Sequence, residues 1–503
     1  MRKIVTVAAV VLIVMASSSS PASAAGVTTH AWMGLDAIDL VSDPALHALL
    51  DAHRGQVEGG AQYPDSGYFN ATIGVPGGDY GEEAHWQRFH DAYADQIASR
   101  PDCGDLTDPN GPCADEIAHL MGMAAHGLGD QVWDWLFEPY APQHGEEYLP
   151  PELAAFVGPG GIEFQMDMVA ITRHGRWTSP DTPALPSAAD LEAAFHSVGR
   201  TDITQSGLVA GKGNMAIIRN VEGALAPVHG PLVEAAMPWT SANFVTAPGG
   251  VDFGAVAIAK LYENLWGRLL GDQPPTEVAI TYPAPGQTDI PTTGWVANFG
   301  PGSHPNRGPA DRRIAAVLTY SRPYVASATD PTSHIPQQLP DGAMTLTDTS
   351  TGLPVPLMGG YPKSVPYGAD PGEHMIAIQP AGDLAACTTY EVAVTEALLD
   401  ANLEPVTPMS WRFTTDGCPP PTSSTTTTSS TTTTSTTTTS TTSTTTTTTP
   451  SSTTTTSTST STSSTSTTRP SSTTSTGASV QSASASPAAA PAVAVQAAPR
   501  FTG

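Results

Sequence analysis

Residues 125–134 of the chain read Ala125-His126-Gly127-Leu128-Gly129-Asp130-Gln131-Val132-Trp133-Asp134. His126, Asp130 and Asp134 recur every four residues, and because four residues is just over one helical turn, they would form one stripe along a helix. The rest of the segment Ala114–Glu138 is mostly apolar, and a helix that is apolar nearly all round is usually buried. Imidazole and carboxylate groups are costly to bury unless they are paired or hold a metal. The sequence therefore predicts a metal-binding helix, with a solvent-facing polar stripe or a salt-bridge network as the alternative.

Asp130 has a special position in this stripe. The two outer residues are about 12 Å apart along the helix axis, so one ion cannot easily use both of them. The middle carboxylate is the natural bridge between two ions, which in multinuclear sites lie about 3.5–4 Å apart. The spacing predicts a centre of more than one ion with Asp130 at its middle.

The composition and the N-terminus indicate an exported, acidic protein. The 503 residues carry 47 acidic and 20 basic side chains, a formal net charge of −27, which disfavours nucleic-acid binding because that needs a basic surface. A basic start, an apolar run too short to span a bilayer comfortably and the small residues Ala22-Ser23-Ala24 predict a secretory signal peptide over residues 1–24. We expect a secreted protein with no transmembrane segment in the mature chain, and association with the cell wall is a further prediction.

The four cysteines of an exported chain suggest two disulfides. Sequence proximity favours the pairs Cys103–Cys113 and Cys387–Cys418 over the other two pairings.

Composition divides the mature chain into four regions. Residues 25–271 are predicted to form a helical domain, with helices at Asp43–His53, Ala114–Glu138, Gly161–Arg173 and Val251–Leu270. Residues 274–418 carry short β-like runs and are predicted to form a β-sandwich. Residues 419–477 are almost pure Thr and Ser and predict a mucin-like stalk, and residues 478–503 predict a disordered Ala/Pro-rich tail.

The end of the predicted sandwich resembles bacterial Ig-like domains of surface-layer proteins. The resemblance rests on Pro380, Leu384, Thr389-Tyr390, Asp400-Ala401-Asn402 and the strand Trp411–Thr415. It implies an all-β Ig-like domain behind an all-α one, and a cell-wall or surface glycan as a partner.

Four further segments of the helical region hold plausible ligands. These are His30, Asp65 in a turn, His85, and the pair Glu163 and Asp167, which share one helix face at i, i+4. Each alone has a structural explanation: Asp65 as a turn cap, His85 as a core histidine, the pair as a solvated face. Together with the stripe they make an ordered set of imidazoles and carboxylates.

This set resembles the zinc-dependent phospholipase C superfamily, nearest to the phospholipase domain of glycosylphosphatidylinositol-specific phospholipase D. The matching segments run in the same order over residues 28–175: Thr29-His30, His53-Arg54, Gly60, Tyr63-Pro64-Asp65, His85-Trp86 and His126 to Asp130.

The resemblance implies an all-α fold in which His30, Asp65, His85, His126 and Asp130 bind zinc. In it Asp130 bridges two ions, and Asp65 is both a ligand and the candidate general base. His53 and Arg54 match the family pattern but are expected to be structural.

The chain departs from that family at three carboxylates. Asp134 stands where the family usually has a histidine, and Glu163 and Asp167 replace a His-x-x-x-Glu pair, with His174 nearby. We include all three among the candidate metal ligands. Two or three zinc ions are expected. Because carboxylates make a harder site, fewer zinc ions, or calcium or manganese at this subsite, are the alternatives.

Three functions remain open on these residues. The first is an exported phosphodiester hydrolase of the phospholipase C type, acting on a phospholipid head group with zinc-activated water. Nearby aromatic side chains would line a head-group pocket unless they belong to the core: Tyr63, Tyr68, Phe69, Trp86 and Trp133. The second function is a single-strand nuclease with related chemistry, and the third is an inactive cell-surface binding protein.

Overall fold

The structure is a computed structural model that describes residues 26–141, 144, 146, 162–176, 184–294, 313–326, 334–336, 339–357 and 373–419. The chain divides into two compact units, residues 1–424 and residues 425–503. The predicted signal peptide, tail and nearly all of the Ser/Thr stalk lie outside the described residues.

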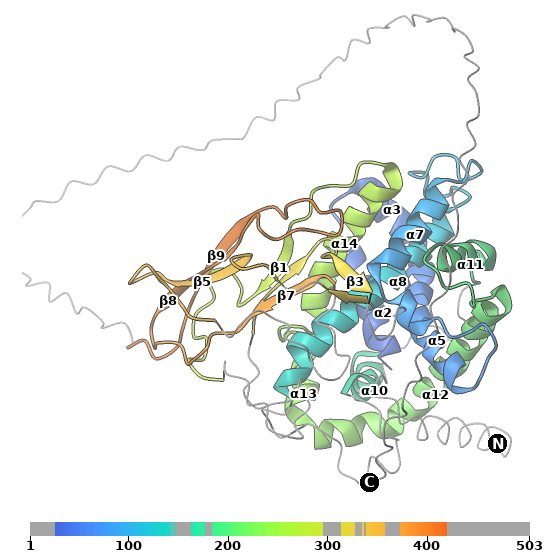
Figure 1. The fold of residues 1–503 in the computed structure, drawn as a ribbon. Helices are drawn as coiled ribbons and strands as arrows, with labels where there is room; N and C mark the ends of the chain where they lie inside the picture. The colour runs from blue at the N-terminus through green and yellow to red at the C-terminus, as the bar shows by residue number, and fades with distance from the viewer. Residues whose placement is uncertain are drawn as a thin grey trace, which may run out of the picture. The chain divides into compact units, whose positions relative to one another are not determined.

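Helices dominate the first part of this unit (Figure 1). Their bounds are α2 (Val27–Ile38), α3 (Pro44–Ala52), α4 (Arg54–Ala61), α5 (Tyr63–Thr72), α6 (Gly81–Ala84), α7 (Gln87–Ala98), α8 (Ala114–Val132), α10 (Ile162–His174), α11 (Ala188–Ser197), α12 (Gln205–Ala236), α13 (Pro238–Asn243) and α14 (Val251–Leu270). A π-helical turn, η1 (Trp133–Phe137), and a 3-10 turn, η2 (Glu138–Tyr140), follow α8.

The four helices predicted from the sequence are all present. Asp43 caps α3 by accepting hydrogen bonds from the amides of Ala45 and Leu46, as its place before a proline predicts. The bounds of α14 agree with the prediction, and it ends at Gly271 in the left-handed conformation that suits a glycine. The long helix α12 was not predicted, because Pro227 and Pro231 lie inside it and proline normally breaks a helix.

The strands are β1 (Val278–Tyr282), β2 (Ile314–Leu318), β3 (Tyr324–Ala326), β4 (His334–Pro336), β5 (Met344–Asp348), β6 (Leu353–Pro354), β7 (Met375–Ile378), β8 (Thr389–Val394) and β9 (Met409–Thr414). They form antiparallel sheets in the orders β1-β2-β7, β3-β4 and β6-β5-β8-β9.

The sheet β1-β2-β7 has two strands that are buried on both faces, β2 and β7. Its side chains Ala315, Val317, Met375 and Ala377 belong to the same hydrophobic core as the helices, and α14 packs against β1 and β2 (Figure 1). The alternate side chains of β2 and β7 belong to a second core, shared with the four-stranded sheet. Because successive residues of a strand point to opposite faces, one face of this sheet packs in the first core and the opposite face packs in the second.

This shared sheet corrects the predicted fold class. An all-α domain followed by a separate all-β Ig-like sandwich is wrong, because the unit is a mixed α/β structure in which about 51% of the described residues are helical and a small sheet closes the helical core. The sequence signal was in β2, whose five residues Ile314–Leu318 are all buried. A continuous apolar run is typical of a strand covered on both faces.

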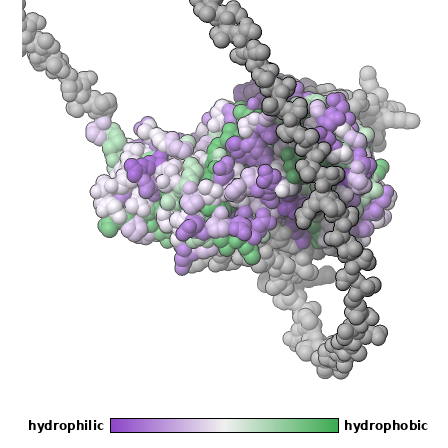
Figure 2. Space-filling view, turned by 90° about the horizontal axis from the view of Figure 1, so that it is seen from above, coloured by the Kyte–Doolittle hydropathy of each residue, from purple (hydrophilic) through white to green (hydrophobic). Residues whose placement is uncertain are grey.

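Both predicted disulfides are confirmed. Cys103 pairs with Cys113 and Cys387 with Cys418, which is compatible with an extracellular protein. Among the described residues, no helix is long and apolar enough to cross a bilayer. The face drawn in Figure 2 carries hydrophilic and hydrophobic residues side by side.

Candidate metal centre

Five of the predicted ligands meet inside the helical core. They come from four places in the chain: His30 from α2, Asp65 from α5, His85 from the end of α6, and His126 and Asp130 from α8. Their ligand atoms form two overlapping groups that share His126, one with Asp65 and His85 and the other with His30 and Asp130. All of them are buried except Asp130, whose side chain is 18% exposed.

His85 and His126 point at each other. Their Nε2 atoms are 3.0 Å apart, and Asp65 Oδ1 lies 3.5 Å from Nε2 of His126 and 3.9 Å from Nε2 of His85. The opposite ring nitrogens face backbone carbonyls, His85 Nδ1 at 2.6 Å from Gly81 O and His126 Nδ1 at 2.7 Å from Ala61 O. Those carbonyls only accept, so each Nδ1 donates and each neutral ring carries its lone pair on Nε2.

Two lone pairs aimed at one point repel unless a cation or a proton lies between them. A metal-bound histidine usually donates its other ring N–H to a carbonyl or carboxylate, and both histidines have that arrangement. Both oxygens of Asp65 are buried without a hydrogen-bond partner, although buried polar atoms are normally satisfied. This donor set of two imidazoles and a carboxylate fits a divalent ion such as zinc.

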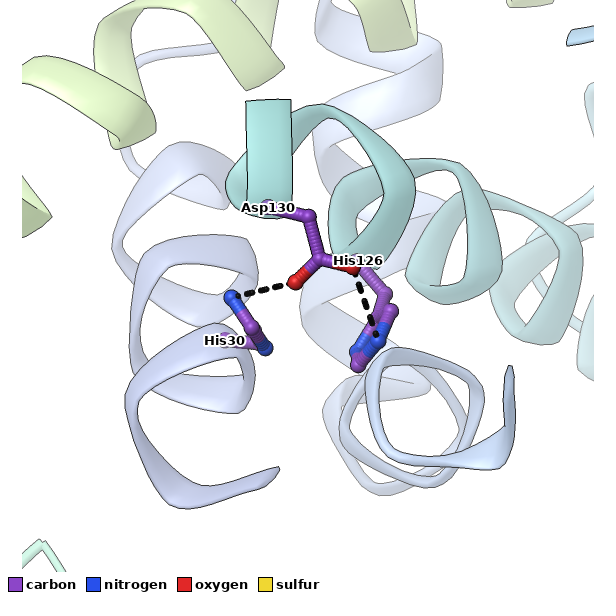
Figure 3. A group of neighbouring side chains, drawn as sticks. All are labelled: His30, His126 and Asp130. Atoms are coloured by element: carbon purple, nitrogen blue, oxygen red, sulfur yellow. Dashed lines mark ion pairs between the residues drawn. The ribbon is translucent and has the colours of Figure 1, made fainter. Parts of the chain in front are cut away.

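Asp130 connects this group to His30 (Figure 3). Its Oδ1 lies 3.0 Å from His30 Nε2, and its Oδ2 lies 3.1 Å from His85 Nε2 and 3.7 Å from His126 Nε2. The two oxygens of one carboxylate therefore serve opposite sides of the site, which is the arrangement that a bridging ligand requires. Glu163 Oε1, 3.5 Å from His30 Nε2, completes the second side.

Two glycines of α8 make room for this convergence. A Cβ at Gly127 would lie 2.2 Å from the carbonyl oxygen of His85, and one at Gly129 would lie 2.8 Å from the ring of His30. Real Cβ atoms do not approach so closely, so the sequence Gly127-Leu128-Gly129 lets two ligands from other segments pack directly on the helix. These glycines are part of the site.

The carboxylates and imidazoles shift one another's pKa. Burial alone would lower the pKa of His85, but the hydrogen bond and charge of Asp130, with the charge of Asp65, outweigh it and raise the pKa to about 9. The same competition, with Asp130 and Glu163 as partners, raises the pKa of His30 well above its usual value. Without metal these imidazoles hold protons, and an ion would have to displace them.

The three carboxylates that depart from the family lie differently. Glu163 contacts His30, whereas Asp134 belongs to the π-helical turn η1, which breaks the four-residue spacing after α8. The pKa of Asp134 is raised well above its usual range by burial and by the charges of Glu163, Glu138 and Asp130. Asp134 thus borders the site without joining either ligand group found among the described residues.

Asp167 has a different set of contacts. It accepts hydrogen bonds from the backbone amides of Thr28 (3.1 Å) and Thr29 (2.7 Å) and from the Thr29 hydroxyl. These amides belong to the first turn of α2, whose N–H groups have no partner within the helix. In the structure Asp167 therefore caps the helix that carries His30.

Sequence reasoning missed Glu222 on α12. Its Oε2 accepts a hydrogen bond of 3.2 Å from the Thr28 hydroxyl, and its Oε1 is buried without a hydrogen-bond partner. Burial and the charge of Asp167 raise its pKa well above its usual range. No local motif marks it, because it reaches the site only through the packing of α12 on α5 and α10.

The remaining candidates are placed as follows. Tyr63 and Trp133 are core residues, whereas Tyr68, Phe69 and Trp86 are half-buried. Tyr68 lies beside the site, with its ring centroid 5.3 Å from that of His85. His174 packs against Trp32 and Phe244.

Comparisons with known proteins add little. No protein family and no curated protein matches the chain. Two solved structures are similar at 11% identity and a TM-score of 0.18, and each match covers 74% of this chain: the N-terminal part of the bacterial S-layer protein SbsC, of which 79% is covered, and a longer structure of that S-layer protein, of which 46% is covered.

Proposed function

We propose that this protein is an exported phosphodiester hydrolase of the phospholipase C type with a dinuclear zinc centre. One observation carries the proposal: the two oxygens of Asp130 face His30 on one side and the converging Nε2 atoms of His85 and His126 on the other. Asp65, His85, His126 and Asp130 would hold one ion, and His30, Asp130 and Glu163 the second. Calcium or manganese is the alternative at the second, carboxylate-richer position.

Bound zinc ions would lower the pKa of a water molecule and neutralise a phosphoryl oxygen. Asp65 would orient that water and accept its proton; this is supported by its two buried carboxylate oxygens without a hydrogen-bond partner and by Oδ1, which lies 3.5 Å from Nε2 of His126. As the water oxygen bonds to phosphorus, the bond to the leaving alcohol breaks and the alcohol oxygen takes up the proton. The products are a phosphate monoester and an alcohol.

The surroundings of the site favour a cationic group on the substrate. The hydroxyl of Tyr68 donates to Glu82 at 2.8 Å, and the indole N–H of Trp86 donates to the same carboxylate at 3.2 Å. Two half-buried aromatic rings around an exposed carboxylate suit a choline-like ammonium group. The acidic composition of the chain disfavours a nucleic-acid substrate.

Elemental analysis combined with a chromogenic choline phosphodiester assay tests the proposal. We expect about two bound zinc ions, turnover that EDTA abolishes, and loss of turnover in Asp65→Asn. Asp115→Asn is a matched control, because Asp115 is 56% exposed and pairs with His53. Turnover of single-stranded DNA instead would indicate the nuclease, and a protein without metal would indicate the inactive binding protein.

A further inference from the structure

The two residues directly before β7 reach into the helical core. Glu373 and His374 are both buried, at 0% and 2% exposure. They lie at the end of the sheet β1-β2-β7 that closes the core, where Leu318 of β2 donates its backbone N–H to His374 O at 2.8 Å. We call Glu373 and His374 the strap.

The strap makes one set of hydrogen bonds to Gln87. Glu373 Oε2 accepts from the backbone N–H of Gln87 at 2.9 Å. His374 Nε2 lies 3.0 Å from Gln87 Oε1, and its Nδ1 lies 3.2 Å from the backbone oxygen of Leu318. Burial lowers the pKa of His374 to about 4, so the neutral ring has one N–H, and we assign it to the shorter contact, in which Nε2 donates to Gln87 Oε1. The amide of Gln87 is fixed in this orientation, because its Nε2 donates to Asp91 at 2.8 Å. Gln87 is the second residue after the ligand His85, at the start of α7.

The strap makes another hydrogen bond to α8. The backbone N–H of His374 donates to Gln131 Oε1 at 2.9 Å. Gln131 directly follows the bridging ligand Asp130 and is itself buried. One short segment of the sheet thus binds the neighbours of two ligands that lie 45 residues apart in sequence, His85 and Asp130.

We propose that the strap is a positioning element of the metal centre: by holding Gln87 and Gln131 at the same time, it sets the separation of His85 and Asp130. The inference rests on the proposed function, because it concerns the metal centre of that site. It goes beyond it in assigning a role to the β-sheet, whose residues contribute no ligand atom to either group found in the described part of the chain.

Metal affinity depends on how accurately the ligand atoms are placed around the ion. Zinc–ligand distances are set to within about 0.2 Å, whereas His85 lies just after the short helix α6, which has only four residues. A loop ligand of this kind needs outside support to keep its position. Partners of this sort around metal ligands typically change metal affinity about 10- to 100-fold when they are removed.

The test compares four variants of the full mature chain for zinc affinity, measured against a competing chelator. His374→Ala removes the bond to Gln87, and Gln131→Met removes only the acceptor for the His374 amide while keeping the side-chain length. The control is Thr276→Val, which removes another buried hydrogen bond beside this sheet, from the Thr276 hydroxyl to Asp400 at 2.6 Å. Thr276 lies two residues before β1, and neither it nor Asp400 is next to a ligand in the sequence.

We expect about 10-fold weaker zinc binding in His374→Ala and in Gln131→Met, partial recovery in His374→Gln, which retains a donor, and wild-type affinity in Thr276→Val. The visible spectrum of the cobalt-loaded protein should change in His374→Ala and Gln131→Met and not in Thr276→Val, because it reports ligand geometry and not stability. Wild-type affinity and spectra in His374→Ala and Gln131→Met would overturn the inference and leave the proposed function standing. An equal loss of affinity in Thr276→Val would overturn the inference in the same way. A wild-type chain that binds no divalent ion would overturn both.

Discussion

His85 and His126 direct their Nε2 atoms at each other across 3.0 Å while their Nδ1 atoms bond to the carbonyls of Gly81 and Ala61. In a neutral pair those two lone pairs would repel in a site where both rings are buried. The arrangement is stable only when a cation or protons occupy the space between them. Most of the predictions below follow from that requirement and from the bridging position of Asp130.

Asp130→Asn should damage the centre much more than Asp134→Asn. Asp130 has ligand atoms within 3.1 Å of histidines on both sides, and the substitution keeps the shape while removing the charge. Asp134 lies in the π-helical turn outside both ligand groups. Metal content per chain after gel filtration measures the difference, and equal retention in the two variants would argue against a bridging role.

The metal-free protein should lose stability as the pH rises from about 6.5 to about 9. The pKa of His85 is raised from 6.5 to about 9 in the folded chain, so its contribution is fully present below pH 6.5 and disappears as the pH passes the folded value. The buried Asp167, with a pKa raised from 3.8 to about 7, acts in the same direction over a lower range.

The gap in melting temperature between metal-loaded and EDTA-treated protein should therefore widen between pH 6 and pH 9. Metal binding requires His85 to give up its proton, which is easier at high pH, and a ligand stabilises in proportion to its occupancy. Thermal melts at the two pH values measure this. A gap that stays constant would mean that His85 does not bind the metal.

Asp167→Asn should destabilise the protein and weaken mainly the His30 side of the centre. The carboxylate accepts three hydrogen bonds from Thr28 and Thr29, and leaving such buried donors short of acceptors costs about 1–3 kcal/mol. Glu222→Gln is the matched variant, since Glu222 accepts a single-donor hydrogen bond from the Thr28 hydroxyl of α2, and it should cost less. If Asp167→Asn lowers the zinc content without changing the melting temperature of the metal-free chain, Asp167 is a metal ligand and not a cap of α2.

Breaking the second disulfide should destabilise the unit without emptying the centre. The sequence separation of Cys387 and Cys418 is 31, against 10 for Cys103 and Cys113. In the chain-entropy model the longer loop contributes about 3–4 kcal/mol, about 1 kcal/mol more than the shorter one. Denaturant melts of the two double Cys→Ser variants, with zinc content as the second measurement, check both parts; a larger loss from the shorter loop would contradict the model.

The sequence predicted the candidate site better than the fold. The four-residue spacing of His126 and Asp130 is a local helical property, and the structure brings them together with His30, Asp65 and His85. The spacing failed at Asp134, because the π-helical turn that begins at Trp133 changes the helical period. The capping contacts of Asp167 depend on how α10 packs on α2, which no spacing reveals.

The predicted fold class was wrong because the boundary between a helical domain and a β domain was drawn from composition alone. The texture of the chain changes near Pro274, but the sheet β1-β2-β7 places Val317 and Met375 in the helical core. Which distant elements pack together is a tertiary property that local sequence patterns do not show. For the same reason, sequence reasoning did not find Glu222 or the strap. The one local signal was the unbroken apolar run Ile314–Leu318, which does not alternate as the strand of a half-exposed sheet would.

Anomalous diffraction from crystals of the zinc-loaded protein tests the central claim most directly. We expect two peaks about 3.5–4 Å apart, one on each side of Asp130, with Nε2 of His85 and His126 at about 2.0–2.1 Å from the first and His30 bound to the second. A single peak that leaves one oxygen of Asp130 without a metal would contradict the bridged centre, and the absence of any peak at these residues would contradict the metal centre itself.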